Sequence, residues 1–111
     1  MDNNIKMRLY DILMAIEEIE SFCIIFNNYE DYCGDLRSKR AIERNIEIIG
    51  EAMRYILKHD ADFEISYARN IVDVRNRIIH GYDTVSDEII WGIVQQHMPI
   101  LKNEVENMLG E

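Results

Sequence analysis

Apolar residues recur at every third or fourth position along most of the chain, which is the spacing that places them on one face of an α-helix. Four separate segments show this spacing, and no segment alternates with the period of two that is typical of a β-strand. We therefore expect an all-α protein whose apolar stripes meet in one core. The four stripes are Ile5, Leu9, Ile12, Ile16, Ile19, Cys23 and Phe26; Ile42, Ile46, Ile49, Met53 and Ile56; Tyr67, Ile71, Val74 and Ile78; and Val94, Met98, Leu101, Val105 and Met108, preceded by Ile90 and Trp91.

Polar segments interrupt the pattern between the expected helices. Residues 27–35 separate the first helix from the second, and residues 58–65 separate the second from the third. Because these connections are short, neighbouring helices should run in opposite directions, as in an up-down antiparallel four-helix bundle. Residues 1–111 are expected to form one domain, since 111 residues suffice for one real core. The candidate N-caps are Asp35 or Ser38 for the second helix, Ser66 for the third, and Thr84 or Ser86 for the fourth.

Two residues should shape the ends and the course of the later helices. Glycine is common just beyond the last turn of a helix, so Gly81 is expected to end the third helix. Pro99 lies inside the fourth helix, where it removes one backbone hydrogen bond and should bend the helix.

Charge is distributed unevenly along the chain. The net charge of −9 would ordinarily argue against a nucleic-acid partner, because non-specific affinity comes largely from Lys and Arg on phosphates. However, residues 36–58 carry six basic and three acidic side chains, and residues 66–82 carry three basic and one acidic. These two segments, together +5, lie within sequence that totals −14. We therefore expect a localised phosphate site in the centre and a solubility or partner surface around it.

Cysteine usage and hydropathy bear on the compartment of the protein. Cys23 falls on an apolar helical stripe and Cys33 in a polar loop, so both are expected to be free thiols in a reducing cytoplasm. The longest stretch without Asp, Glu, Lys or Arg runs from Ile89 to Leu101 and has 13 residues. A membrane-spanning helix needs about 20. The sequence thus favours a cytoplasmic protein.

The third expected helix carries a cluster of chemically active side chains. Arg75, Asn76 and His80 fall within two helical turns, and Asn76 and His80 share a face because residues four apart stack on a helix. Arg provides a permanent charge and a fork suited to phosphate oxygens. His can transfer protons in both directions near neutral pH. Cleavage of a phosphodiester needs both functions, although a surface arginine and a partly buried histidine would be the commoner interpretation of such residues.

The pattern Arg-x4-His-x-Tyr, with Asn directly after the Arg, resembles the signature of the HEPN superfamily. Within it, the chain is similar to the HepT-like toxin subunits of HEPN–MNT toxin–antitoxin pairs, where MNT denotes a minimal nucleotidyltransferase. The resemblance covers nearly the whole chain. It includes residues 40–52, which are similar to the family's second-helix signature, residues 71–82 in the motif helix, and residues 91–101 with Pro99 in the last helix.

The resemblance implies a metal-independent endoribonuclease toxin that needs no cofactor and acts as a homodimer. Two motif helices would meet across the two-fold axis and form one composite cleft. The implied catalytic residues are Arg75, Asn76 and His80 of each protomer. His80 would move the proton of a ribose 2′-hydroxyl or of the leaving 5′-oxygen, and Arg75 would stabilise the phosphorane. Asn76 would orient His80 or the phosphate.

Tyr82 has a separate, regulatory role in the same resemblance. In HepT-like subunits the motif tyrosine accepts adenylyl groups from the nucleotidyltransferase antitoxin. Added phosphate at the mouth of the cleft would repel RNA, as phosphorylation does. The alternative is that Tyr82 is a packing residue after the end of a helix.

The remaining charged and imidazole groups near the motif have weaker assignments. Arg69 and Arg77 are candidate accessory RNA contacts. Asp73 is four residues from each of them and could pair with either one. His59 and His97 lie in or beside polar surroundings without a matching partner, so both are expected to be structural.

A carboxylate metal site is not expected. Glu43, Glu47 and Glu51 are spaced by four residues, but ferritin-like sites need Glu-x-x-His pairs, which this chain lacks. Ion pairs within the helix, with Arg40 and Arg44 among the available partners, explain these glutamates better.

A non-catalytic function is the main alternative. The acidic composition would also suit a helical binding module that docks a nucleotidyltransferase and cleaves nothing, and a fold alone does not decide function. The two hypotheses differ in whether Arg75 and His80 are exposed in a shared dimer cleft or are buried singly in the core.

Overall fold

The computed structural model describes residues 1–81 and 85–110. Every regular element in this part of the chain is helical, so the predicted all-α class is confirmed. The elements are α1 (Asn3–Cys23), α2 (Tyr29–Cys33), α3 (Leu36–His59), α4 (Ala68–Ile79), α5 (Asp87–Gly92), the π-helical turn η1 (Ile93–His97) and α6 (Met98–Leu109).

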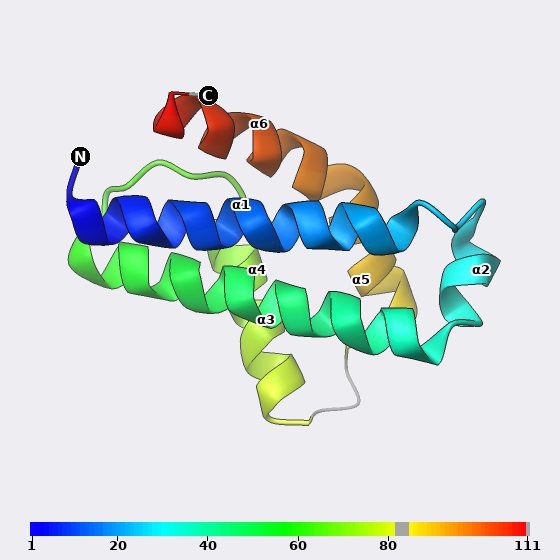
Figure 1. The fold of residues 1–111 in the computed structure, drawn as a ribbon. Coiled ribbons are helices and arrows are strands. Elements are labelled where there is room, and N and C mark those ends of the chain that lie inside the picture. Colours follow the sequence, from blue (N-terminus) through cyan, green and yellow to red (C-terminus); the bar gives the residue numbers. More distant parts are fainter. Residues whose placement is uncertain (82–84, 111) are drawn as a thin grey trace.

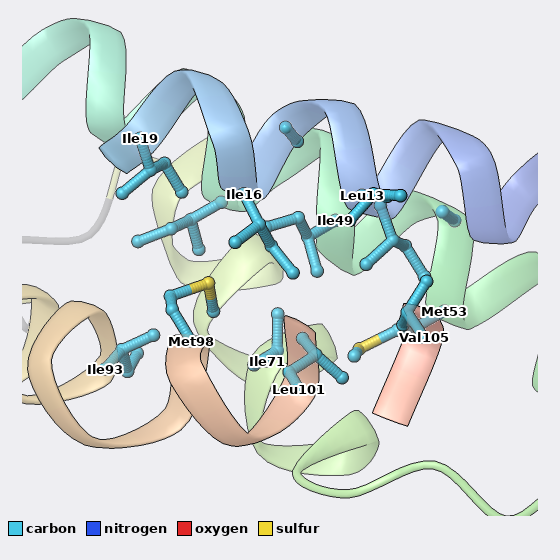
Figure 2. Close-up of a cluster of buried hydrophobic side chains, with 14 of the residues drawn as sticks. Leu13, Ile16, Ile19, Ile49, Met53, Ile71, Ile93, Met98, Leu101 and Val105 are labelled. Atoms are coloured by element: carbon cyan, nitrogen blue, oxygen red, sulfur yellow. The ribbon is translucent and has the colours of Figure 1, made fainter. Parts of the chain in front are cut away.

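The four predicted stripes form one core. Figure 2 shows side chains from α1, α3, α4 and α6 converging, with Ile16 of α1 beside Ile49 of α3. Both side chains are 0% exposed, as are Ile71 of α4 and Leu101 of α6. Burial of one such side chain stabilises a fold by roughly 1.5–3 kcal/mol. The periodic apolar positions therefore provide most of what holds the helices together.

The long helices define the overall arrangement, and α4 is set at an angle to them. In Figure 1, α1 and α3 lie side by side in opposite directions, and α6 lies along the other side of α1. Helix α4 packs on α3 but crosses it steeply, so that its C-terminal end extends past the edge of α3 (Figure 1). The hydrophobic period predicts which face of α4 is buried, but it carries no information on this crossing angle.

A short helix occupies the segment that separates the first two predicted helices. Asn28 caps α2 by accepting a hydrogen bond from the N–H of Asp31 at 2.9 Å. The buried ring of Tyr32 packs against Trp91, with ring centroids 5.3 Å apart. Five residues are too few for a hydrophobic period to be visible, so aromatic packing with α5 decides this helix.

Two of the predicted helix caps are confirmed and one is wrong. Asp35 accepts a hydrogen bond from the N–H of Ser38 at 3.1 Å at the start of α3, and Ser86 accepts from Ile89 at the start of α5. Ser66 does not cap α4, because its N–H and hydroxyl both donate to the carboxylate of Glu104 in α6. Tyr67 is the N-cap instead, with a left-handed φ of 63°. Thr84, the other candidate at the start of α5, lies outside the described residues.

The predicted bend at Pro99 is confirmed. Pro99 is the second residue of α6, and the π-helical turn η1 immediately precedes that helix. Proline has no N–H to donate to the carbonyl four residues earlier, and both prolines and π-helical turns are recognised causes of a change in helix direction. Figure 1 shows the chain changing direction between α5 and α6.

The remaining global expectations concern thiols and membranes. Cys23 and Cys33 are both free thiols. Over residues 1–81 and 85–110, none of the helices combines the length and the apolar character that crossing a membrane requires.

Candidate active site

The last turn of α4 positions the motif side chains. Helix α4 ends at Ile79, and His80 is its C-cap, with its N–H donating to the carbonyl of Asn76 at 3.1 Å. The predicted alignment of Asn76 and His80 is thus present in the backbone. Gly81 follows with a φ of +68°, in the left-handed region that favours glycine. The prediction that Gly81 ends this helix is confirmed.

Arg75 and Asn76 form a hydrogen-bonded pair. The Nη1 group of Arg75 donates to Oδ1 of Asn76 at 2.9 Å. The Nε–H of Arg75 is buried and has no acceptor among the residues that the structure describes. A guanidinium carries five N–H donors, and Nη1 of Arg75 uses one of them on Asn76. Asn76 therefore orients Arg75, a partnership that the helical stripe of Asn76 and His80 did not indicate.

Gly50 allows Arg75 to occupy its position. A Cβ atom on Gly50 would lie 2.5 Å from Cβ of Arg75, 3.0 Å from its Cγ and 3.1 Å from the carbonyl oxygen of Ile71. The first of these distances is too short for any side chain, so only glycine lets α4 approach α3 this closely. Sequence reasoning missed this role. The available signal was a glycine in the middle of an amphipathic helix, which costs about 1 kcal/mol relative to alanine unless packing requires it.

The exposure of the motif residues shows whether they are buried in the core. His80 is exposed, and Arg75 and Asn76 are half-buried at the packing of α4 on α3. None of the three lies in the apolar core. Arg75 and His80 are therefore not buried in the apolar core.

The two accessory arginines differ in their surroundings. Arg77 lies 3.8 Å from the carboxylate of Asp73, and both side chains are largely exposed. Arg69 is exposed as well and has no carboxylate partner within the described parts of the chain. The open question of which arginine Asp73 holds is thus answered in favour of Arg77.

The histidines assigned to structural roles both stack on tyrosines. The ring of His59 lies 4.1 Å from that of Tyr55, and its Nδ1 is 3.0 Å from the Tyr55 carbonyl oxygen. The ring of His97 lies 3.9 Å from that of Tyr67 in a parallel stack. Burial lowers the pKa of His97 below its usual value. Both rings thus have packing contacts away from the motif.

The glutamates of α3 behave as ion-pair partners. Arg40 contacts Glu43 at 3.1 Å and Arg44 contacts Glu47 at 3.0 Å. In the described residues, no group of three His, Cys, Asp or Glu side chains is arranged to hold a metal ion. Tyr82, the candidate acceptor of adenylyl groups, lies outside the described residues.

Comparison with known proteins gives the family of this chain. Residues 12–108 match the family described as "Ribonuclease HepT-like". The chain is similar to "Putative RNase MJ1380" of Methanocaldococcus jannaschii, with 33% identity over 107 residues that cover 93% of this chain and 94% of that protein. It is also similar to "Probable ribonuclease HepT" of Thermococcus cleftensis, with 36% identity over 115 residues that cover 97% of this chain and 98% of that protein.

The match to the family extends over α3, α4 and α6, which are the elements that build and support the site. No solved structure matches the chain closely. The chain belongs to the HepT-like ribonuclease family of the HEPN superfamily, and it is a ribonuclease.

Proposed function

We propose that this protein is the metal-independent endoribonuclease toxin of a toxin–antitoxin pair, with Arg75, Asn76 and His80 as its catalytic residues. The observation that carries the proposal is the Arg75 guanidinium, which Asn76 holds through a 2.9 Å hydrogen bond in the second half of α4. An exposed imidazole follows one turn later at His80. A charged fork beside a proton carrier is what phosphodiester cleavage requires.

The proposed reaction is an intramolecular transesterification. One His80 removes the proton of the ribose 2′-hydroxyl, and the 2′-oxygen forms a bond to phosphorus. The bond from phosphorus to the 5′-oxygen breaks, and a second, protonated His80 gives its proton to the leaving 5′-oxygen. The products are a 2′,3′-cyclic phosphate and a 5′-hydroxyl. Arg75 stabilises the charge on the equatorial oxygens of the phosphorane, and the Asn76 amide holds Arg75 in place.

The two-histidine reaction requires a second copy of the chain, so the proposal includes a homodimer through α4. Ile79 supports this surface, because it is 46% exposed although it lies on α4 beside the motif. A dimer with a two-fold axis at this helix would bring two copies of the same surface together. It would also double the positive charge around the scissile phosphate.

Replacement of His80 tests the catalytic assignment. We expect His80→Ala to abolish cleavage of a fluorescent RNA, because general acid–base catalysis contributes about 10²–10⁴-fold per group. Its melting temperature should stay near that of the wild type, since the side chain is exposed. His59→Ala is the matched control and should retain full cleavage. A folded His80→Ala protein with wild-type activity, or cleavage that EDTA abolishes, would contradict the proposal.

Disruption of the α4 surface tests the dimer. We expect Ile79→Glu to sediment as a monomer at micromolar concentration and to lose cleavage while it keeps its helical circular dichroism. Ile100→Glu is the control, because Ile100 is also 46% exposed but lies on α6. A fully active wild-type monomer would exclude the composite site.

We further propose that a nucleotidyltransferase antitoxin silences the enzyme by transferring AMP from ATP to the Tyr82 hydroxyl, with release of pyrophosphate. Tyr82 comes two residues after the exposed His80 in sequence, so added phosphate would repel RNA from the site. Tyr82→Phe should cleave RNA normally and escape silencing when a nucleotidyltransferase is co-expressed. AMP-sized additions that map by mass spectrometry to Tyr67 or another tyrosine would refute this assignment.

A further inference from the structure

The lysines and arginines of this chain fall into two groups. Of the twelve, six form ion pairs, namely Arg8, Lys39, Arg40, Arg44, Arg77 and Lys102. Twelve minus six leaves six without a carboxylate partner among the described residues. Five of those six, Arg37, Arg54, Lys58, Arg69 and Arg75, belong to α3 and α4. In a chain with 21 acidic residues, this concentration of unpaired cations on two adjacent helices is unexpected for an ordinary solvated surface.

Three of these cations line one hollow between the two helices. Arg54 and Lys58 of α3 face Arg69 of α4 across a groove of about 490 Å³. Leu57 and Val72 complete its apolar lining, and Asp73 is the one carboxylate in it. Asp73 is already 3.8 Å from Arg77. The lining therefore carries a net charge of +2, from three cations and one carboxylate.

Residues of the groove and of the proposed active site lie on the same face of α4. On α4, Arg69, Asn76 and His80 are separated by seven and four residues, so the three share one stripe. From Arg69 to His80 this stripe is about 16 Å long, at 1.5 Å per residue. On α3, Gly50 and Arg54 are four residues apart, and Gly50 is the residue in contact with Arg75. The groove and Arg75 thus both lie at the crossing of α3 and α4, and the stripe continues from there to His80 at the C-terminal end of α4 (Figure 1).

We propose that this groove is a second phosphate site, in which Arg54, Lys58 and Arg69 bind the RNA backbone more than one nucleotide away from the scissile phosphate. This inference rests on the proposed ribonuclease site and extends it. Three cations in one groove repel one another, and the repulsion is relieved when a polyanion binds. Leu57 and Val72 offer apolar surface to a ribose or a base, whereas the two long α3 side chains can reach phosphate oxygens from one wall.

The groove also explains how an acidic protein holds RNA. With a net charge of −9, the molecule as a whole repels a polyanion, so affinity must come from a local field. Neutralised phosphates release counterions, and each contact with a single strand contributes about 0.7 to the slope of log affinity against log salt. The groove therefore determines how much RNA is bound, while the motif residues determine where it is cut.

The test compares two double variants of α3 in the inactive His80→Ala background. Arg54→Gln/Lys58→Gln removes the α3 wall of the groove. Arg40→Gln/Arg44→Gln removes the same charge from the same helix, at residues that are paired with Glu43 and Glu47. Binding of a labelled single-stranded RNA is measured by fluorescence anisotropy over a range of salt concentrations. We expect the groove variant to bind more weakly and its salt slope to fall by about 1.4, for two lost contacts. The control should keep the salt slope of the His80→Ala parent.

Substrate length gives a second readout in the active background. A dinucleotide reaches only the scissile phosphate, so the groove variant should cleave it at the wild-type rate. A longer RNA should be cleaved with a raised KM and an unchanged kcat. Equal loss of cleavage on both substrates would mean that Arg54 and Lys58 support the active site itself, and it would overturn a separate phosphate site.

The outcomes separate this inference from the proposed catalytic site. If the wild type binds RNA with the expected slope but no RNA is cut, the catalytic proposal fails and the groove stands. If the groove variant and the control have the same slope, the groove is not an RNA site, whatever the fate of the catalytic proposal. If RNA binding is unchanged and the groove variant alone sediments as a monomer, the groove is a protein contact and the inference is wrong.

Discussion

Helix α3 makes two contacts of opposite character. Against α1 it presents large aliphatic side chains, and Figure 2 shows Ile49 meeting Ile16 there. Against α4 it presents Gly50, and the two backbones approach so closely that a single Cβ would clash with Arg75. The first contact is filled by side chains that are 0% exposed. The second places the stem of a charged residue against bare backbone.

The comparison distinguishes a contact that stabilises the fold from a contact that positions the Arg75 guanidinium. Apolar burial is non-directional, so the contact of α1 with α3 needs suitable volume and a correct stripe. The contact of α3 with α4 fixes where one guanidinium lies, and catalytic groups tolerate little displacement. Substitutions at the first contact should therefore act on folding, and substitutions at the second should act on both folding and cleavage.

The largest expected effect comes from breaking the first contact. Ile16→Ala should lower the free energy of unfolding by about 2–5 kcal/mol, because it removes buried apolar volume and leaves a cavity. Met14→Ala on the same helix is the control, since Met14 is 66% exposed and should change stability by less than about 0.5 kcal/mol. Urea unfolding at fixed protein concentration gives both values. The comparison would be wrong if the folded Ile16→Ala protein had lost its specific activity.

A smaller loss of stability but a clear loss of activity is expected at the second contact. Gly50→Ala should cost about 1–3 kcal/mol, because the added methyl pushes α4 away from α3. Cleavage by the folded protein should fall as Arg75 is displaced. Gly92→Ala is the matched control, since nothing lies within 4 Å of its added Cβ, and alanine should stabilise α5 by roughly 0.5–1 kcal/mol.

A rate measurement at a temperature where both variants are folded decides the role of Gly50. If Gly50→Ala kept full cleavage, close approach would not be what positions Arg75. A normal rate for Gly92→Ala together with a reduced rate for Gly50→Ala would support the positioning role.

The smallest expected effect concerns His97, which joins α4 to the last helix through its stack on Tyr67. Burial lowers the pKa of folded His97 below the ordinary value of 6.5. Below that pH the unfolded chain takes up a proton more readily than the folded one, so acidification favours unfolding. This contribution to stability is complete above about pH 6.5 and is lost as the pH falls toward the lowered pKa.

The measurement is urea unfolding at pH 7.5 and 5.5. His97→Phe keeps an aromatic ring against Tyr67 but cannot titrate, so it should lose less stability than the wild type between the two pH values. If the wild type and His97→Phe lost the same free energy of unfolding between the two pH values, ionisation of His97 would not contribute to the pH dependence of stability.

Most of the architecture could be predicted because it depends on local periodicity. Three of the stripes correspond to α1, α3 and α4, and the fourth runs through α5, η1 and α6. Gly81 marks the end of α4 and Pro99 the break near the start of α6, since each feature is encoded within a few residues. Helix α2 could not be predicted in this way. Its five residues are held by Tyr32 against Trp91, and these residues are far apart in the sequence. The cap at Ser66 failed for the same reason, because Glu104 of α6 competes for its donors.

The chemistry of the site was similarly divided. The sequence by itself determined which helix carries the motif and which residues share its face, because spacing along one helix fixes both. It also indicated the family, through the resemblance of three separate segments of the chain. Only the tertiary structure decided that Asn76 holds Arg75, that Asp73 pairs with Arg77, and that Gly50 sets the distance between α3 and α4. The physical reason is that the two side-chain pairs depend on the rotamers adopted, and the approach of α3 to α4 depends on the angle at which the helices cross. Neither the rotamers nor the crossing angle is encoded in the spacing of residues along one helix.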